Sequence, residues 1–334
     1  PRETIAKEFF KTHKDEYDFL VIFTNFDFNM LYADTTAFYS QVKNDTHGIG
    51  LEIFDNSDMY GSSGKLQGTI DMGNILSLET SPLGPKFEDT LDILSHEALH
   101  RWAAHVSFKA VDDTISSTLR GQHDSHWSFL LDTDGSLLYG NDWQDNGNGT
   151  FTSKASRKYY SPLDMYLMGF NDKSQVPPMM LINNPGVDPT RSSETGVTIS
   201  GTPRYITIDD IIAAEGERLP KPSESQKTFK TAFILITSPD TFTGYEIYGI
   251  ENLRNAWVTR FSILTDGKGI MQVAQALKED LPEKPGVLPP SVEQRTLPPD
   301  INDGVTWLIN NQQVDGRWID ISQTVTRDTA AAVL

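Results

Sequence analysis

The sequence contains no cysteine, and this absence limits both how the fold is held together and how the chain could bind a metal. Disulfide bonds are excluded, and so is a zinc site built from thiolates. A zinc site would therefore need histidine and carboxylate ligands. Only 7 histidines occur among the 334 residues, and five of them lie between positions 96 and 126. This clustering directs the search for a metal site to one short region.

Basic residues and long apolar runs are also scarce. With 28 lysines and arginines against 46 aspartates and glutamates, the net charge is −18, which disfavours a nucleic-acid partner or an anionic membrane surface. The longest apolar runs, such as residues 19–23 and 232–236, are far too short to cross a bilayer. We therefore expect a globular protein with no membrane span and no nucleic-acid partner.

The first residues include neither an initiator methionine nor an apolar signal region, so we expect a processed or trimmed piece of a longer protein. A lack of cysteine is typical of many exported bacterial proteins. We expect a secreted or cell-surface location.

The most informative feature present is an H-E-x-x-H pattern within residues 87–106, a stretch with helical periodicity. His96 and His100 project from one side of this predicted helix. The opposite side is apolar and consists of Leu91, Leu94, Ala98 and Trp102. Because histidines at i and i+4 lie about one turn apart, both ring nitrogens can reach one Zn²⁺, with Glu97 beside it as a base. The alternative is a surface helix with two unrelated histidines.

Two residues further along are candidates for the third ligand. Ser161 suits a helix N-cap, Pro162 the first helical position and Gly169 the residue after the helix. Asp164 falls in the first turn of this short predicted helix, where it either complements the helix dipole or binds zinc. We predict the second role. His126, in a polar loop, is the reserve candidate.

A glycine-rich loop after residue 140 concentrates carboxylate and amide oxygens. The residues concerned are Asp142, Asp145, Asn146 and Asn148. Such a loop suits either a Ca²⁺ site or an ordinary turn, and its spacing does not match the EF-hand loop.

Periodicity predicts an α+β fold for residues 1–280, with short strands that include a buried one at 17–24. Residues 66–72 read as an edge strand that could pair with an extended peptide, or as one more strand of the sheet. Residues 281–300 contain six prolines, which indicates a stiff linker. Residues 301–334 would then begin a further C-terminal domain.

The pentapeptide H-E-A-L-H, residues 96–100, resembles the zinc signature of the zincin metallopeptidases. The resemblance implies a twisted mixed sheet with an active-site helix. The metzincin extension would place Gly at 103 and His at 106, where this chain has Ala103 and Val106. The stretch S-P-L-D-M-Y-L-M-G, residues 161–169, is similar to an element of zincins in which an aspartate binds zinc, which implies Asp164 as a ligand.

Further motifs extend the resemblance over about residues 15–280. H-W-S-F (126–129), D-N-G-N-G-T-F (145–151) and Y-S-P-L-D-M-Y-L-M-G (160–169) resemble a group of exported bacterial metallopeptidases. The tail, with Gln312, Gly316 and Trp318, resembles a Q-x-x-x-G-x-W repeat of α/α-toroid proteins related to terpene cyclases and prenyltransferases. A single repeat is not stable alone, so this resemblance implies a truncated helical repeat domain.

Together these features predict a zinc-dependent endopeptidase that acts on a protein or peptide substrate. His96, His100 and Asp164 would bind zinc, and Glu97 would take a proton from water and pass it to the leaving amine. His126, Tyr160 or Tyr166 would stabilise the oxyanion. One alternative is a non-catalytic exported adhesion or binding module with a structural or vestigial zinc site, although such a site needs no base like Glu97. Hydrolysis of a non-peptide amide or ester is another alternative.

Overall fold

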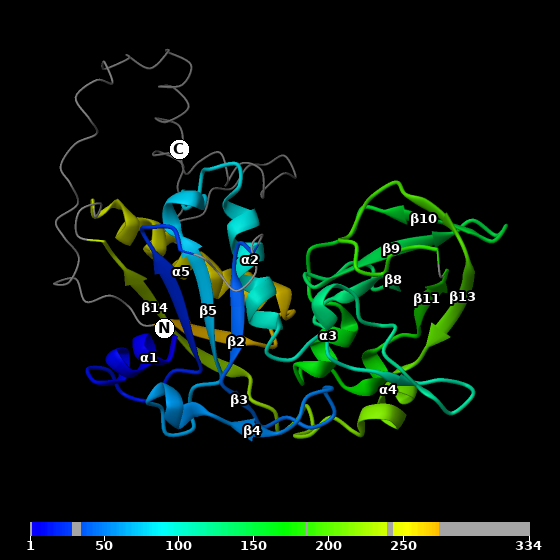
Figure 1. The fold of residues 1–334 in the computed structure, drawn as a ribbon, viewed down its shortest axis with the longest axis horizontal. Helices are drawn as coiled ribbons and strands as arrows, with labels where there is room; N and C mark the ends of the chain where they lie inside the picture. The colour runs from blue at the N-terminus through cyan, green and yellow to red at the C-terminus, as the bar shows by residue number, and fades with distance from the viewer. Residues whose placement is uncertain (1, 29–34, 185, 239–242, 274–334) are drawn as a thin grey trace, which may run out of the picture. The chain divides into compact units, whose positions relative to one another are not determined.

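The computed structural model describes residues 2–28, 35–184, 186–238 and 243–273, which form an α+β fold (Figure 1). The predicted linker, 281–300, and the predicted repeat domain, 301–334, lie outside the described residues. The predicted α+β class is confirmed. None of the described helices is long and apolar enough to cross a membrane.

A five-stranded mixed sheet carries the N-terminal part of the fold, in the order β15-β14-β1-β5-β2. The first four strands run parallel, and β2 runs antiparallel to β5 at one edge. Their bounds are β1 Phe19–Thr24, β2 Phe38–Gln41, β5 Gly68–Asn74, β14 Thr228–Ile236 and β15 Ile270–Val273. β1 is buried along its whole length, as residues 17–24 predict, because its apolar side chains need cover on both faces.

Of the two interpretations of residues 66–72, an edge strand is wrong and one more strand of the sheet is confirmed. β5 lies between β1 and β2 and is buried at six of its seven positions. β2, with one buried position of four, is the edge strand. Residue types did not identify β5 as the buried strand, because its sequence contains Gly, Thr and Asp among its apolar residues.

Two helices lie next to this sheet and pack against each other: α2 (Phe87–Leu99) and α5 (Tyr245–Leu264) (Figure 1). The predicted apolar side of α2 is confirmed, since Leu91, Leu94 and Ala98 are buried. The helix is shorter than the predicted 87–106 and ends at Leu99. After it, the buried Arg101 side chain donates hydrogen bonds to Gln67, Asn44 and Asp45, which fixes the chain as it leaves the helix.

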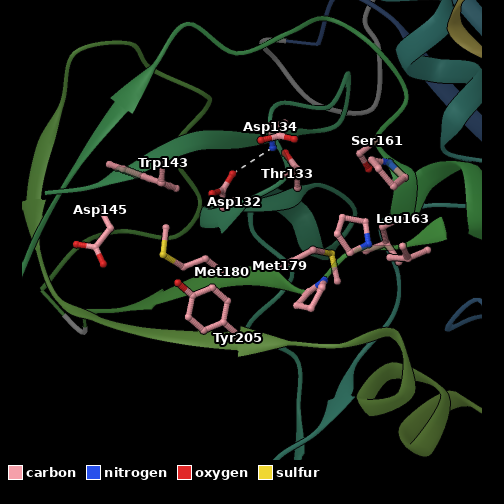
Figure 2. Close-up of a pocket in the computed structure, with 14 residues that line it drawn as sticks. Asp132, Thr133, Asp134, Trp143, Asp145, Ser161, Leu163, Met179, Met180 and Tyr205 are labelled. Carbon is pink, nitrogen blue, oxygen red and sulfur yellow. Dashed lines mark hydrogen bonds between the residues drawn. The ribbon is translucent and has the colours of Figure 1, made fainter. Parts of the chain in front are cut away.

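The second sheet has six strands, in the order β12-β10-β9-β8-β11-β13. Their bounds are β8 Trp127–Asp132, β9 Tyr139–Asp145, β10 Thr150–Lys154, β11 Met179–Asn183, β12 Thr198–Ser200 and β13 Thr202–Ile206. Four of these strands, β8, β9, β11 and β13, line a pocket of about 240 Å³ together with neighbouring loops and the start of α3 (Pro162–Leu167) (Figure 2). Apolar side chains, including Met179 and Met180, share this pocket with Asp132, Asp134 and Asp145.

The remaining elements are short. They are the helices α1 Arg2–Phe10, α3 Pro162–Leu167 and α4 Ile208–Glu215, the 3-10 turns Ser57–Tyr60, Ile75–Ser77, Gln122–Asp124 and Lys173–Gln175, and the strand pairs β3 Lys43–Asn44 with β4 Phe54–Asp55 and β6 Phe108–Lys109 with β7 Ile115–Ser116.

The predicted boundaries of α3 are confirmed. Ser161 is the N-cap and forms a capping box with Asp164, and Pro162 is the first helical residue. Gly169 follows the helix with φ of 80°, a left-handed conformation that favours glycine. A Cβ at this position would also lie 2.5 Å from the Arg218 guanidinium carbon. The helix is therefore fixed at both ends by local chemistry.

One apolar core includes residues of both sheets and of α2, α3 and α5. Aromatic rings are concentrated around Phe261 of α5, which is fully buried. Its neighbours, with ring centroids 6.1–6.4 Å away, are Tyr160, Phe170, Phe229 and Trp257. Because Tyr160 directly precedes the capping box of α3, this cluster connects α5 to α3.

We expect Phe261→Ala to lower the free energy of unfolding by about 3–5 kcal/mol, because it leaves a cavity among these rings. Urea unfolding followed by circular dichroism measures the change. Ile263→Ala, on the same helix but 62% exposed, is the control and should change stability by less than about 0.5 kcal/mol. Equal losses in the two variants would contradict this account of the core.

Candidate metal centre

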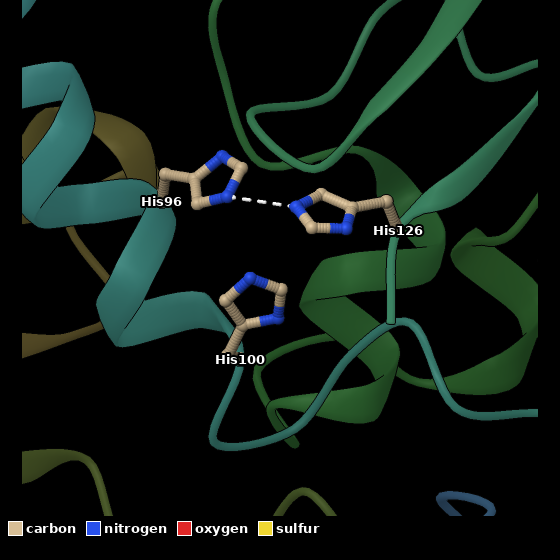
Figure 3. A group of neighbouring side chains, drawn as sticks. All are labelled: His96, His100 and His126. Carbon is tan, nitrogen blue, oxygen red and sulfur yellow. Dashed lines mark hydrogen bonds between the residues drawn. The ribbon is translucent and has the colours of Figure 1, made fainter. Parts of the chain in front are cut away.

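Three histidines from two parts of the chain converge on one point (Figure 3). His96 lies in the last turn of α2, His100 directly follows this helix, and His126 directly precedes β8. One ring nitrogen from each lies within 4.8 Å of those of the other two. The ring centroids are 4.9–5.0 Å apart. The structure therefore assembles the two histidines of the H-E-x-x-H pattern with the reserve candidate, His126.

The spacing of the nitrogens fits a shared cation. His96 Nε2 and His126 Nε2 are 3.0 Å apart. Two nitrogens bound to one tetrahedral Zn²⁺, each at about 2.0–2.1 Å, lie about 3.3 Å from each other. Three imidazoles also form the kind of donor set that zinc takes in catalytic sites. The residues present therefore fit zinc.

Backbone carbonyls orient two of the three rings. His96 Nδ1 donates to the Leu137 carbonyl at 2.6 Å, and His126 Nδ1 donates to the Gln122 carbonyl at 3.0 Å. Because a carbonyl only accepts, the proton of each ring is on Nδ1, and Nε2 is left with a lone pair. This arrangement is the usual one for a histidine that binds a metal. Leu137 and Gln122 are partners that the sequence pattern did not indicate.

Burial and mutual repulsion keep the three rings neutral. Burial lowers the pKa of His96 to about 4. Burial, with repulsion from His96, lowers the pKa of His126 to about 3. The pKa of His100 is also lowered well below its ordinary value, first by burial and then by the other two histidines. Neutral imidazole is the form that binds a metal.

Glu97 lines the same cavity as the histidines, as predicted. Its side chain is 7% exposed, and burial raises its pKa to about 8, although a hydrogen bond from the backbone of Tyr39 opposes this rise. Tyr39 belongs to the edge strand β2. A base beside the metal position thus also contacts the strand that borders the cavity.

The cavity has a volume of about 1070 Å³ and is large enough for several residues of a peptide. Its lining includes α2, the edge strand β2, the loop around His126, and residues 136–139. Lys158 at one side of the cavity pairs with Asp89 and Asp92 of α2.

The prediction that Asp164 is the third ligand is corrected. Its carboxylate is fully buried, lies outside the three-histidine group and does not line the cavity. It accepts hydrogen bonds from Trp127 Nε1, Ser136 Oγ and the backbone N–H of Ser161. His126, the reserve candidate, lies with His96 and His100 instead.

The two predicted oxyanion tyrosines also lie elsewhere. The Tyr160 hydroxyl is buried and donates to the Ser95 carbonyl at 2.9 Å. The Tyr166 hydroxyl accepts from the backbone N–H of Arg218 at 3.3 Å. Neither side chain lines the cavity. Each hydroxyl instead forms a hydrogen bond with a backbone group, that of Ser95 in α2 or that of Arg218.

Sequence reasoning missed Tyr139, which does line the cavity. Its ring stacks on His126 with centroids 4.6 Å apart and lies 5.7 Å from His96. Tyr139 has φ of 74°, which is uncommon for a residue other than glycine and is often found at functional sites. The single sequence signal was its place after the Asp134-Gly135 turn, which does not point to a metal site.

The predicted calcium loop is a turn between β9 and β10. Asp145 accepts from the backbone of Gly147, and Asn148 accepts from Thr150. Asn146 donates its amide to Thr150 and Thr152. Asp142 is grouped instead with two other carboxylates, those of Asp132 and Asp134. Calcium binding stays a prediction.

Comparisons with protein-family models, with curated proteins and with solved structures found no match. The function is therefore argued from the geometry of the site.

We expect His126→Ala to weaken zinc binding by more than about 100-fold, because loss of a ligand exceeds the roughly 10–100-fold cost of losing an outer partner. Competition with a chromophoric chelator measures the dissociation constant. His123→Ala is the control, since His123 lines the cavity outside the three-histidine group. If His123→Ala weakens binding as much as His126→Ala, the assignment of the third ligand is wrong.

Asp132, which lines the pocket in Figure 2, gives a prediction of how the stability of the protein depends on pH. Burial raises the pKa of Asp132 to about 6 from 3.8, so its ionised form is disfavoured in the folded state. This penalty is complete above pH 6 and disappears as the pH falls towards 3.8. Asp132→Asn should raise Tm by about 2 °C at pH 7.5 and leave it unchanged near pH 4.

Differential scanning fluorimetry in the presence of a chelator tests this expectation without interference from bound cations. Asp145→Asn, an exposed carboxylate of the same pocket, is the control and should show no gain. A lower Tm for Asp132→Asn at pH 7.5 would show that ionised Asp132 is stabilising.

Proposed function

We propose that this protein is a zinc-dependent peptidase of the zincin type. One observation carries the proposal: three neutral histidines present ring nitrogens to one point, and Glu97 lies in the same large cavity. The H-E-A-L-H sequence supports the same conclusion. A secreted or cell-surface location and a further C-terminal domain belong to this proposal.

His96, His100 and His126 would hold the metal. When bound, zinc supplies a Lewis acid and a water whose pKa is lowered to about 7. Glu97, whose ionised form a bound cation would favour, would accept the proton as the water oxygen adds to the carbonyl carbon, and would deliver it to the amine as the C–N bond breaks. One water is consumed, and the products are a carboxylate and an amine. Tyr139, beside His126, is the candidate donor to the developing oxyanion.

The number of ligands supports a catalytic rather than a structural site. Structural zinc sites are closed by four protein ligands, whereas catalytic sites have three and an open position. Among the described residues, no further histidine or carboxylate joins the group of His96, His100 and His126. The three histidines also line the cavity, so a metal held by them would have space beside it for water and a substrate.

The edge strand β2 supports a peptide as the substrate. Within the described residues β2 pairs with β5 on one side only, and its residues Phe38, Tyr39 and Gln41 line the cavity. An extended peptide can add to such an edge through main-chain hydrogen bonds. An ester or a small amide would use little of this strand.

We expect Glu97→Gln to retain zinc and to lower peptide hydrolysis by about 100- to 10,000-fold, because the amide cannot accept the proton. Hydrolysis of a quenched fluorescent peptide library measures the rate, and elemental analysis measures bound zinc. Asp89→Asn is the matched control, a carboxylate on the same helix and in the same cavity. It should keep most of the activity.

Two results would contradict the proposal. Full activity of Glu97→Gln would exclude Glu97 as the base. A zinc-loaded protein that cleaves no peptide of the library, yet loses stability when zinc is removed, would support the alternative of a binding module with a structural zinc.

A further inference from the structure

We propose that Asp164 is a positioning residue: it fixes the orientation of two of the three histidines through hydrogen bonds to residues near them. Its carboxylate joins Trp127, which follows His126, to Ser136, which precedes the residue whose carbonyl orients His96. The inference rests on the proposed zinc site, but it concerns the assembly of that site and not the reaction.

The first connection leads to His126. Asp164 Oδ1 accepts a hydrogen bond of 2.8 Å from Trp127 Nε1. Trp127 directly follows His126, and both its side chain and its backbone are buried at the start of β8. Fixing the indole therefore fixes the point at which the chain presents the His126 ring.

The second connection leads to His96. Asp164 Oδ2 accepts a hydrogen bond of 2.7 Å from Ser136 Oγ. Ser136 directly precedes Leu137, whose carbonyl accepts from His96 Nδ1 at 2.6 Å. The position of that carbonyl sets the rotation of the imidazole, and with it the direction of Nε2.

The two connections close into a ring of hydrogen bonds. Ser136 Oγ also accepts from the Leu138 N–H at 3.0 Å, and the Leu138 carbonyl accepts from the Trp127 N–H at 2.8 Å. The path from Asp164 through Ser136, Leu138 and Trp127 returns to Asp164. Displacement of any member shifts the others, so the two histidine supports are coupled.

The neighbouring Tyr160 connects the same segment of the chain to α2. Its hydroxyl donates to the carbonyl of Ser95, the residue before His96. The short segment from Tyr160 to Asp164 therefore contacts the helix that carries His96, the strand that follows His126 and the loop that orients His96.

A carboxylate is required at this position because all three of its partners are donors. Trp127 Nε1 meets one oxygen, while Ser136 Oγ and the Ser161 N–H meet the other. In an asparagine, one oxygen becomes an NH₂ group. Whichever way the amide turns, this NH₂ faces either the indole N–H or the Ser161 N–H, and neither can accept a hydrogen bond. Asp164→Asn therefore loses at least one of these three hydrogen bonds and places an NH₂ group against an N–H donor, with almost no change in volume.

The test compares zinc affinity and the absorption spectrum of the Co²⁺-substituted protein in wild type and Asp164→Asn. We expect about a 10- to 100-fold loss of zinc affinity, the usual cost of losing an outer-shell partner, and a changed Co²⁺ spectrum. Ser161→Ala is the matched control. It removes the N-cap acceptor of α3 but leaves the backbone N–H that Asp164 accepts.

Ser161→Ala should lower Tm while keeping zinc affinity within about threefold of wild type and the Co²⁺ spectrum unchanged, because loss of an N-cap costs about 1 kcal/mol without touching the ring. Wild-type zinc affinity and spectrum in Asp164→Asn would overturn the inference. So would equal losses in both variants, since Asp164 would then act through stability alone.

If Asp164→Asn does not fold, Ser136→Ala tests the same ring by removing one donor. We then expect a smaller loss of zinc affinity, about 10-fold, with a changed Co²⁺ spectrum; unchanged values overturn the inference. Failure of the proposed function is separate, because it is seen in the wild-type protein, which then either binds no zinc or binds zinc and cleaves no peptide.

Discussion

The hydrogen bond from His96 to the Leu137 carbonyl is the contact on which the proposed metal centre depends. It joins α2, which packs beside the five-stranded sheet, to the loop between two strands of the six-stranded sheet. Together with the hydrogen bond from the Tyr160 hydroxyl to the Ser95 carbonyl, it connects the H-E-x-x-H helix to the part of the chain that carries the third histidine. At 2.6 Å it also selects the tautomer that leaves Nε2 available.

The gathering of these titratable side chains in one site is unfavourable for folding. Three imidazoles and a carboxyl group are gathered in a partly buried site, where protonation of one ring would repel the next and ionisation of Glu97 is disfavoured. Such a cluster contributes little to folding, and proteins retain groups of this kind where they bind or react. The surrounding core provides the stability instead, chiefly through the aromatic rings around Phe261 and the capped helix α3. With no cysteine in the chain, no disulfide supplements these interactions.

Sequence reasoning was most successful where local chemistry determines the outcome. The buried strand β1, the apolar side of α2 and the boundaries of α3 all depend on residues adjacent in sequence, and all were predicted correctly. It failed where the outcome depends on neighbours distant in sequence. Whether β5 or β2 is the edge strand depends on pairing, and whether the hydroxyl of Tyr160 faces the cavity or the Ser95 carbonyl depends on tertiary packing. Tyr139 could not be identified, because its role arises only from its stacking on His126.

Asp164 shows why residue type alone does not separate a ligand from a support. A carboxylate in the first turn of a helix offers about four lone-pair sites, and a metal or a set of N–H and O–H donors can use them equally well. The groups that surround the two carboxylate oxygens determine whether the residue acts as a ligand or as a support. Here three donors converge on them in a place without exposure to solvent, and no basic side chain of the described residues forms an ion pair with them. The negative charge is therefore balanced by hydrogen bonds to the same chain segments that orient the histidines. A metal ligand would have had to turn towards the cavity and leave those donors unpaired, at a cost of about 1–3 kcal/mol each.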